Sequence, residues 1–298
     1  MTARRAGFVA LLGAPNAGKS TLLNRLVGAK VSIVTPKAQT TRSRILGIRN
    51  HGATQAVFVD TPGIFEPRRR LERAMVRRAW RAAGDADMTV LLVDAARRAG
   101  AREEAIVASL KAGGRQAVLA LNKIDLIARE RLLARADRLY GTGCFSDVFM
   151  VSALTGDGVD DLLEHLAARL PEGPWLYPED DLSDVPLRFL AAEITREKLF
   201  LRLHDEIPYD VATETADWQE FDNGGVRIDQ TVYVRRTTQR AIVLGKGGAR
   251  IKAVREAAQA ELADALDRPV HLFLTVRVRE GWPDDPERFR DLGLDYNV

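Results

Sequence analysis

Short apolar runs alternate with segments of helical length over the first 170 residues. Each run has four to six residues and is bounded by Gly, Pro, Asp or Asn; the runs are Phe8–Leu12, Gln55–Val59, Met88–Val93, Ala117–Leu121 and Val148–Val151. A segment of helical length over 101–112 ends at two glycines, as helices commonly do. The alternation predicts an α/β domain with a largely parallel sheet, helices on both faces and ligands at the carboxyl ends of the strands.

A stretch rich in Pro and acidic residues, 171–181, interrupts this rhythm and is typical of a linker. The elements expected after it are a strand, a hairpin turn, a second strand, a helix and a last strand, over residues 210–221, 222–225, 226–236, 249–266 and 271–279. The turn sequence is Asp-Asn-Gly-Gly. We therefore expect a second, smaller domain of mixed α and β structure.

Composition sets few limits on function. Of the 298 residues 46% are hydrophobic and 29% charged, and the net charge is only +3. The single cysteine, Cys144, cannot form an internal disulfide, which fits a reducing compartment. The apolar run after Arg4 and Arg5 is too short for a leader, and no stretch approaches the about 18 apolar residues of a membrane span. We expect a cytoplasmic protein, and peripheral association with the inner face of the cell membrane is left open.

The clearest motif is Gly13-Ala-Pro-Asn-Ala-Gly18-Lys19-Ser20, a full match to the phosphate-binding loop GxxxxGK[ST]. Its backbone N–H groups can surround a β-phosphate, Lys19 can reach the β- and γ-phosphates, and the Ser20 hydroxyl can ligate Mg²⁺. The strand before it and the helical pattern after it are the context that this loop requires. The nucleotide-binding residues predicted here are Asn16, Ala17, Gly18, Lys19, Ser20 and Thr21.

Three further motifs follow other predicted strands. Asp60-Thr61-Pro62-Gly63 offers an acid for Mg²⁺ and the Gly63 N–H as a sensor of the γ-phosphate. Asn122-Lys123-Ile124-Asp125 offers a carboxylate that can accept hydrogen bonds from the ring N–H and the amino group of guanine, which argues against an ATPase. Ser152-Ala153-Leu154 offers the Ala153 N–H to guanine O6. Together the motifs predict a guanine-nucleotide site.

The second domain carries a GxxG loop within Leu244–Lys252. Glycines there let the backbone approach nucleic-acid phosphates, and basic side chains surround the same strip. The predicted RNA-binding residues are Gly245, Lys246, Gly247, Gly248, Arg250 and Lys252. A plain joint between two helices is the alternative. Because the loop lies between the helical segment 238–244 and the helix expected over 249–266, after a hairpin and before a last strand, we favour binding of single-stranded RNA.

With these motifs in this order the chain resembles the Era family of GTPases, which joins a GTPase domain to a KH domain. The segment Lys37-Ala38-Gln39-Thr40-Thr41-Arg42 resembles the first switch of that family, and the ending from Gly281 to Leu294 resembles the family's ending. The resemblance implies an α/β P-loop domain with a six-stranded, mostly parallel sheet over 1–174, a linker over 175–186 and an α+β type II KH domain over 187–298.

The resemblance also implies a GTPase with GTP or GDP as ligand and Mg²⁺ as cofactor. Mg²⁺ would be held by Ser20, Asp60 and a switch threonine, for which Thr41 is the choice and Thr40 the second candidate. Asn16 matches an asparagine that related GTPases use to hold K⁺. The implied catalytic residues are Lys19, Thr41, Gly63 and Asn16. The implied partners are the 3′ region of 16S rRNA and the 30S ribosomal subunit, whose assembly it would assist; we expect a monomer that does not bind DNA.

Some features point away from catalysis or leave a choice. Ile64 stands where many GTPases have the glutamine that orients the attacking water, so we expect slow intrinsic hydrolysis. A non-enzymatic RNA-binding protein that retains nucleotide is thus an alternative. The arginine-rich segment 68–81 either contacts RNA or is a solvated helix. Four histidines and the one cysteine show no zinc-ligand spacing; the histidines are His51, His165, His204 and His271.

Overall fold

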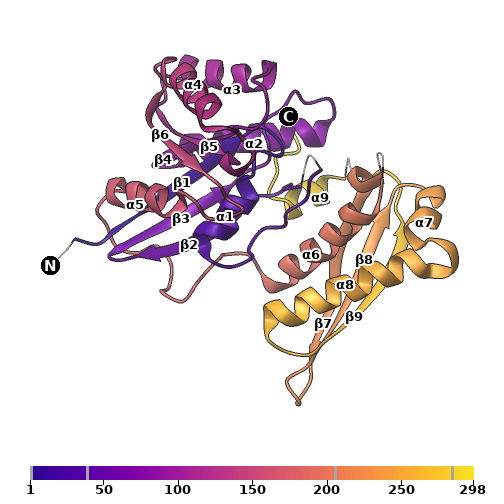
Figure 1. Cartoon of the computed structure of the whole chain (residues 1–298). Helices are drawn as coiled ribbons and strands as arrows, with labels where there is room; N and C mark the ends of the chain where they lie inside the picture. Colours follow the sequence, from indigo (N-terminus) through magenta and orange to yellow (C-terminus); the bar gives the residue numbers. More distant parts are fainter. Residues whose placement is uncertain (1–2, 38–39, 205–206, 283–284) are drawn as a thin grey trace. The chain divides into compact units, whose positions relative to one another are not determined.

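The computed structural model describes residues 3–37, 40–204, 207–282 and 285–298, and its contacts divide the chain into two compact units (Figure 1). Unit 1 comprises Met1–Ser32, Thr41–Asp184 and Leu292–Val298, and unit 2 comprises Ile33–Thr40 and Val185–Asp291. Each unit therefore contains one short segment that is remote in sequence from the rest of it. The predicted positions Ala38 and Gln39 lie outside the described residues.

Unit 1 is built on a six-stranded sheet with the order β2-β3-β1-β4-β5-β6. Its strands are β1 (Arg5–Gly13), β2 (Ile45–His51), β3 (Thr54–Asp60), β4 (Met88–Asp94), β5 (Ala117–Asn122) and β6 (Phe145–Val151). All neighbouring pairs are parallel except β2 and β3. The predicted six-stranded, mostly parallel sheet is confirmed. Strands β2 and β3 lie on one side of β1, and β4, β5 and β6 lie on the other. The direction in which strands are added therefore reverses at β1, and sheets of this kind bind ligands at such a point.

Helices cover both faces of this sheet, which explains why its central strands are apolar throughout. The helices are α1 (Lys19–Val27), α2 (Arg70–Asp85), α3 (Ala101–Ala112), α4 (Arg129–Tyr140) and α5 (Val159–Arg169). Side chains of α2, α3 and α4 form one core with alternate residues of β1, β4 and β5. Helices α1 and α5 contact each other and the sheet (Figure 1). This rigid support fixes the loops at the carboxyl ends of the strands.

Unit 2 has a three-stranded sheet with the order β7-β8-β9. Its elements are α6 (Leu187–Arg202), β7 (Val211–Glu220), β8 (Val226–Val234), α7 (Thr237–Leu244), α8 (Ala249–Leu266), β9 (Val270–Val278) and α9 (Pro286–Asp291). The hairpin strands β7 and β8 are antiparallel, whereas β8 and β9 are parallel. Helices α6 and α8 pack on the sheet through two apolar clusters. The α-β-β-α-α-β order confirms the predicted type II KH fold.

The segment Ile33–Thr40 belongs to unit 2 through contacts with α6. The Val34 N–H donates to Glu197 Oε1 at 2.7 Å, and the Arg196 guanidinium donates to the carbonyl of Thr40. Arg196 is only 1% exposed and also forms an ion pair with Glu193. A buried charge that is paired in this way fixes the backbone it contacts.

Within the described ranges, no helix combines the length and the apolar character that crossing a bilayer requires. The sequence pattern located five of the six strands of unit 1 and missed β2. That strand has apolar side chains only in its first half, and its Gly47 lies so close to α1 that a Cβ there would be 2.6 Å from Leu23 and Val27.

We expect Leu119→Ala to destabilise unit 1 by about 2–5 kcal/mol, because Leu119 is fully buried in β5 and its removal leaves a cavity. Leu133→Ala on α4 is the matched control, since Leu133 is 47% exposed and should cost less than about 1 kcal/mol. The free energy of unfolding of both variants can be measured in urea, with hydrogen exchange in peptides from β1 to β6 as the readout for unit 1. Similar losses for the two variants would contradict this account of the core.

Candidate functional site

The phosphate-binding loop connects β1 to α1 at the centre of the sheet. Gly18 begins α1 with a φ of 99°, and a Cβ there would lie 2.2 Å from Asn122 Nδ2. Only glycine fits this position without displacing Asn122. The Lys19 ammonium donates to the carbonyls of Gly13 and Ala14 at 3.1 Å each, so it lies across the loop opening.

Three hydroxyl groups converge on one carboxylate oxygen beside this loop. Asp60 Oδ2 accepts hydrogen bonds from Ser20 Oγ at 2.7 Å, Ser32 Oγ at 2.9 Å and Thr41 Oγ1 at 3.0 Å. Thr40 Oγ1 instead contacts Thr35 Oγ1 at 2.7 Å. The structure therefore brings Thr41, and not the second candidate Thr40, to Ser20 and Asp60.

The other oxygen of Asp60, Oδ1, is buried and has no hydrogen-bond partner among the described residues. A buried acceptor without a partner is costly, and hard cations such as Mg²⁺ bind carboxylate and hydroxyl oxygens. The donor set of Ser20, Thr41 and Asp60 therefore fits the predicted Mg²⁺.

Burial shapes the electrostatics of this pair of charged groups. It raises the pKa of the Asp60 carboxyl, against the Lys19 charge and the three hydroxyl groups. It lowers the pKa of the Lys19 ammonium to about 8, although Asp60 favours the charged form. A phosphate beside Lys19 and a cation beside Asp60 would each shift the pKa of that group back toward its ordinary value.

Asn122 joins three predicted motifs at the end of β5. Its Nδ2 donates to the Ala17 carbonyl at 2.8 Å, and its Oδ1 accepts from the Ala153 N–H at 2.9 Å. Its side chain is only 1% exposed. In this structure the Ala153 N–H is thus directed to Asn122, and its contact with guanine O6 stays a prediction.

The other residues predicted to bind the base lie at the same edge of the sheet. Asp125 is exposed, and its Oδ1 accepts from Ser152 Oγ at 2.6 Å. Arg25 donates to the carbonyls of Ala153 and Leu154. A cavity of about 400 Å³ lies here; its lining includes Thr21, Asn24, Arg25, Lys30, Ala153 and Leu154. The exposed Asp125 carboxylate is therefore available to a ligand.

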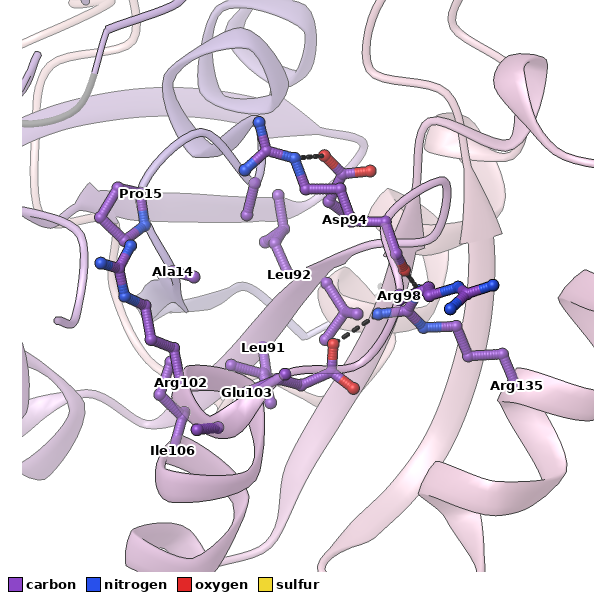
Figure 2. A pocket seen from close by; sticks show the side chains of 15 residues that line it. Ala14, Pro15, Leu91, Leu92, Asp94, Arg98, Arg102, Glu103, Ile106 and Arg135 are labelled. Carbon is purple, nitrogen blue, oxygen red and sulfur yellow. Dashed lines mark hydrogen bonds and ion pairs between the residues drawn. The ribbon is translucent and has the colours of Figure 1, made fainter.

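Asp94, at the end of β4, is a residue that the motifs did not identify. Its Oδ2 accepts from Lys123 Nζ at 2.8 Å and lies 3.4 Å from Arg97 Nε. Figure 2 shows Asp94 at the rim of a cavity of about 380 Å³ between the phosphate-binding loop and α3, where Glu103 also pairs with Arg135. An acid at a strand end was the signal that identified Asp60, and it could have identified Asp94. Ser32 carries no such signal.

Ile64 points away from the loop opening. It is 7% exposed and packs in the core with Ala10 and Leu12, while its N–H donates to the Gly13 carbonyl at 3.0 Å. Gly63 lies against the loop, since a Cβ there would be 2.9 Å from Pro15. A buried apolar side chain at this position cannot orient an attacking water by a hydrogen bond.

In unit 2 the GxxG loop forms a 3₁₀ turn at Lys246–Gly248 between α7 and α8. Gly245, Gly247 and Gly248 all have positive φ angles, and at the last two a Cβ would meet nothing within 4 Å. The backbone of these two glycines is thus open to a ligand, as the prediction requires.

The basic residues around this loop differ in how far their side chains are already engaged in contacts within the protein. Lys246 is exposed and Lys252 pairs only loosely with Glu256 at 3.9 Å, whereas the Arg250 guanidinium donates to the Ile242 carbonyl at the end of α7. Arg250 thus has a structural contact that the sequence did not indicate. Its predicted RNA contact stays a prediction.

Known proteins match this chain over nearly its whole length. A family model described as "50S ribosome-binding GTPase" matches residues 8–123, and one described as "KH domain" matches residues 206–283. "GTPase Era" of Rhizobium meliloti (strain 1021) is 59% identical over 292 residues, which cover 98% of this chain and 93% of that protein. "GTPase Era" of Caulobacter vibrioides (strain NA1000 / CB15N) is 54% identical over 308 residues, covering 99% and 98%.

Two solved structures are similar to this chain over nearly its whole length. One is a variant of Aquifex aeolicus Era bound to GDP.AlF4-, and the other is Era in complex with MgGDPNP and nucleotides 1506–1542 of 16S ribosomal RNA. Each has a TM-score of 0.92 and 37% sequence identity, and each match covers 99% of this chain and 100% of the other.

We expect affinity for GDP, measured in EDTA, to fall roughly tenfold between pH 7 and pH 9. The reason is that Lys19, with a pKa of about 8, is charged below that pH and loses its attraction for phosphate above it. Lys19→Arg is the control, because arginine stays protonated throughout, and its profile also corrects for ionisation of guanine. Parallel profiles in a fluorescent-GDP titration would rule out this role of Lys19.

Proposed function

Because this chain belongs to the Era family of P-loop GTPases with a C-terminal KH domain, we propose that its nucleotide state controls its binding to RNA. The RNA is the 3′ region of 16S rRNA, and the process it assists is assembly and maturation of the 30S subunit. The observation that supports this most is the likeness over 99% of the chain to Era in complex with MgGDPNP and 16S rRNA nucleotides. The protein acts as a cytoplasmic monomer, with RNA and not DNA as its partner.

The proposal divides the tasks along the chain. We assign nucleotide binding to residues 1–174, the linker to 175–186 and RNA binding to 187–298, of which the tail Leu292–Val298 packs with unit 1. The likeness to structures that contain MgGDPNP and GDP.AlF4- supports Mg²⁺ and guanine nucleotides as ligands. Asn16, Ala17, Gly18 and Thr21 surround the phosphates with their backbone, and Lys19 neutralises them. Asn122, Lys123, Asp125 and the loop Ser152–Leu154 select guanine.

Ser20, Asp60 and Thr41 hold the Mg²⁺, which when bound neutralises charge on the β- and γ-phosphates. The hydrogen bonds that these three side chains make to one another hold their oxygens together before a ligand arrives. Thr41 belongs to the first switch, so its hydroxyl can report the γ-phosphate to the segment before it. Gly63, beside Pro15, can report it through its N–H.

Hydrolysis has to proceed without help from the side chain at position 64, since Ile64 is apolar and packs in the core. We expect a slow intrinsic rate for this reason. Asn16 is the candidate to hold K⁺ at the phosphates, where the cation would stabilise developing charge as an arginine does in other GTPases. Its backbone, with a φ of 65°, holds it in the loop in a conformation that asparagine tolerates.

Replacing K⁺ with Na⁺ should slow GTP hydrolysis at least tenfold if Asn16 holds K⁺. Asn16→Gly should abolish the difference between the two salts, because glycine removes the amide and adopts the same φ without strain. Steady-state phosphate release in matched K⁺ and Na⁺ buffers tests both statements. Equal wild-type rates would eliminate the K⁺ site and leave the GTPase unaffected.

Gly248→Asp should weaken binding to single-stranded 16S rRNA 3′-end oligonucleotide by tenfold or more, since repulsion of phosphate and loss of close approach each cost about 1–3 kcal/mol. Gly248→Asn is the matched control: asparagine tolerates the φ of 79° equally well and carries no charge, so the difference isolates repulsion. GDP affinity and RNA-independent hydrolysis should stay near wild type. Unchanged RNA binding in Gly248→Asp would reduce the loop to a helix joint.

A further inference from the structure

Helix α2, which follows the DTPG motif, presents a dense row of arginines. Arg70, Arg77 and Arg81 recur at helical spacing on one face, and Arg73 and Arg78 flank them. Within the described residues Arg73 and Arg78 form no ion pair. Partial burial lowers the pKa of Arg78, and repulsion from Arg44 and Arg81 adds to this effect. We call these five residues the α2 arginine surface.

The tail Leu292–Val298 lies on this surface and belongs to the same unit (Figure 1). Asp295 Oδ2 is 3.9 Å from Arg77 Nη1 and 3.7 Å from Arg81 Nη2, and the Arg70 guanidinium lies 4.6 Å from the centre of the Tyr296 ring. These ion pairs are partly exposed, and such contacts are individually weak. The tail therefore contacts three of the five arginines and leaves Arg77 and Arg81 about half exposed, so a stronger anion can displace it.

We propose that the α2 arginine surface binds the phosphate backbone of RNA and that the tail competes with RNA for it through Asp295. The proposal rests on the RNA-binding part of the proposed function and adds a second contact, in unit 1. Guanidinium groups bind phosphate in a bidentate manner, and a phosphate backbone offers several charges where the tail offers one carboxylate at this point.

RNA suits this surface better than a membrane does. A helix that binds in a membrane interface keeps an apolar face free to enter the acyl layer. The apolar face of α2 is already buried in the core of unit 1; it consists of Leu71, Ala74, Met75, Ala79 and Ala83. The outward face of α2 carries positive charge and little apolar area, as expected for a surface that binds a phosphate backbone.

The test uses the full chain with Gly248→Asp, which disables the proposed KH contact, and a fluorescein-labelled 30-nucleotide polyuridylate. Ending this chain at Leu294, or replacing Asp295 with Asn, should tighten binding at least fivefold in 50 mM KCl. The decrease of affinity with salt should also steepen, because more phosphates are contacted. Arg77→Glu with Arg81→Glu should remove the gain, whereas Arg129→Glu with Arg131→Glu on exposed positions of α4 should not.

The proposal is overturned if tail removal and Asp295→Asn both leave RNA binding unchanged, or if the gain persists in the Arg77→Glu, Arg81→Glu variant. A gain in binding to phosphatidylglycerol vesicles without a gain for RNA would overturn the choice of partner. Asp295→Asn keeps the tail's length and apolar contacts, so it still tests the proposal if truncation unfolds unit 1. Failure of the KH contact would appear separately, as equal RNA binding with and without Gly248→Asp.

Discussion

The nucleotide site depends on one buried amide. Asn122 bonds to the phosphate-binding loop through Ala17 and to the loop after β6 through Ala153, at 2.8 and 2.9 Å. Each loop is a short connection that follows a strand of the sheet. The amide fixes the distance between them, and glycine at position 18 is the condition for its approach. Any change that shifts β5 relative to β1 therefore alters the loops predicted to bind the phosphates and the base together.

Lys19 and Asp60, in and beside the phosphate-binding loop, are held in an electrostatically unfavourable environment. Lys19 and Asp60 are both buried, and burial shifts the pKa of each toward its neutral form. The fold tolerates this because the surrounding strands are held by an extensive apolar core. A ligand that brings phosphate to Lys19 and a cation to Asp60 relieves both shifts at once. Binding of nucleotide and of metal should accordingly reinforce each other.

Much of the fold followed from the sequence, because buried parallel strands are continuous apolar runs and their carboxyl ends carry the motifs. The pattern therefore located β1 and β3 to β6 and placed Lys19, Asp60 and Asn122 at one edge of the sheet. It missed β2, whose Gly47 serves the packing of α1 rather than strand formation. It also could not show that Ser32 turns back onto Asp60, or that Arg250 bonds to Ile242, because both contacts depend on side-chain directions that only tertiary structure sets.

The tail on α2 has a consequence for synthesis of the chain. Domains generally fold as they emerge, at about 5–20 residues added per second. The sheet that supports α2 is complete in sequence once β6 has been made, but the tail follows only after the 107 residues from Val185 to Asp291. A nascent chain therefore passes through an interval of roughly 5–20 seconds in which the arginines of α2 are folded into place and the tail residues that contact them have not yet been made.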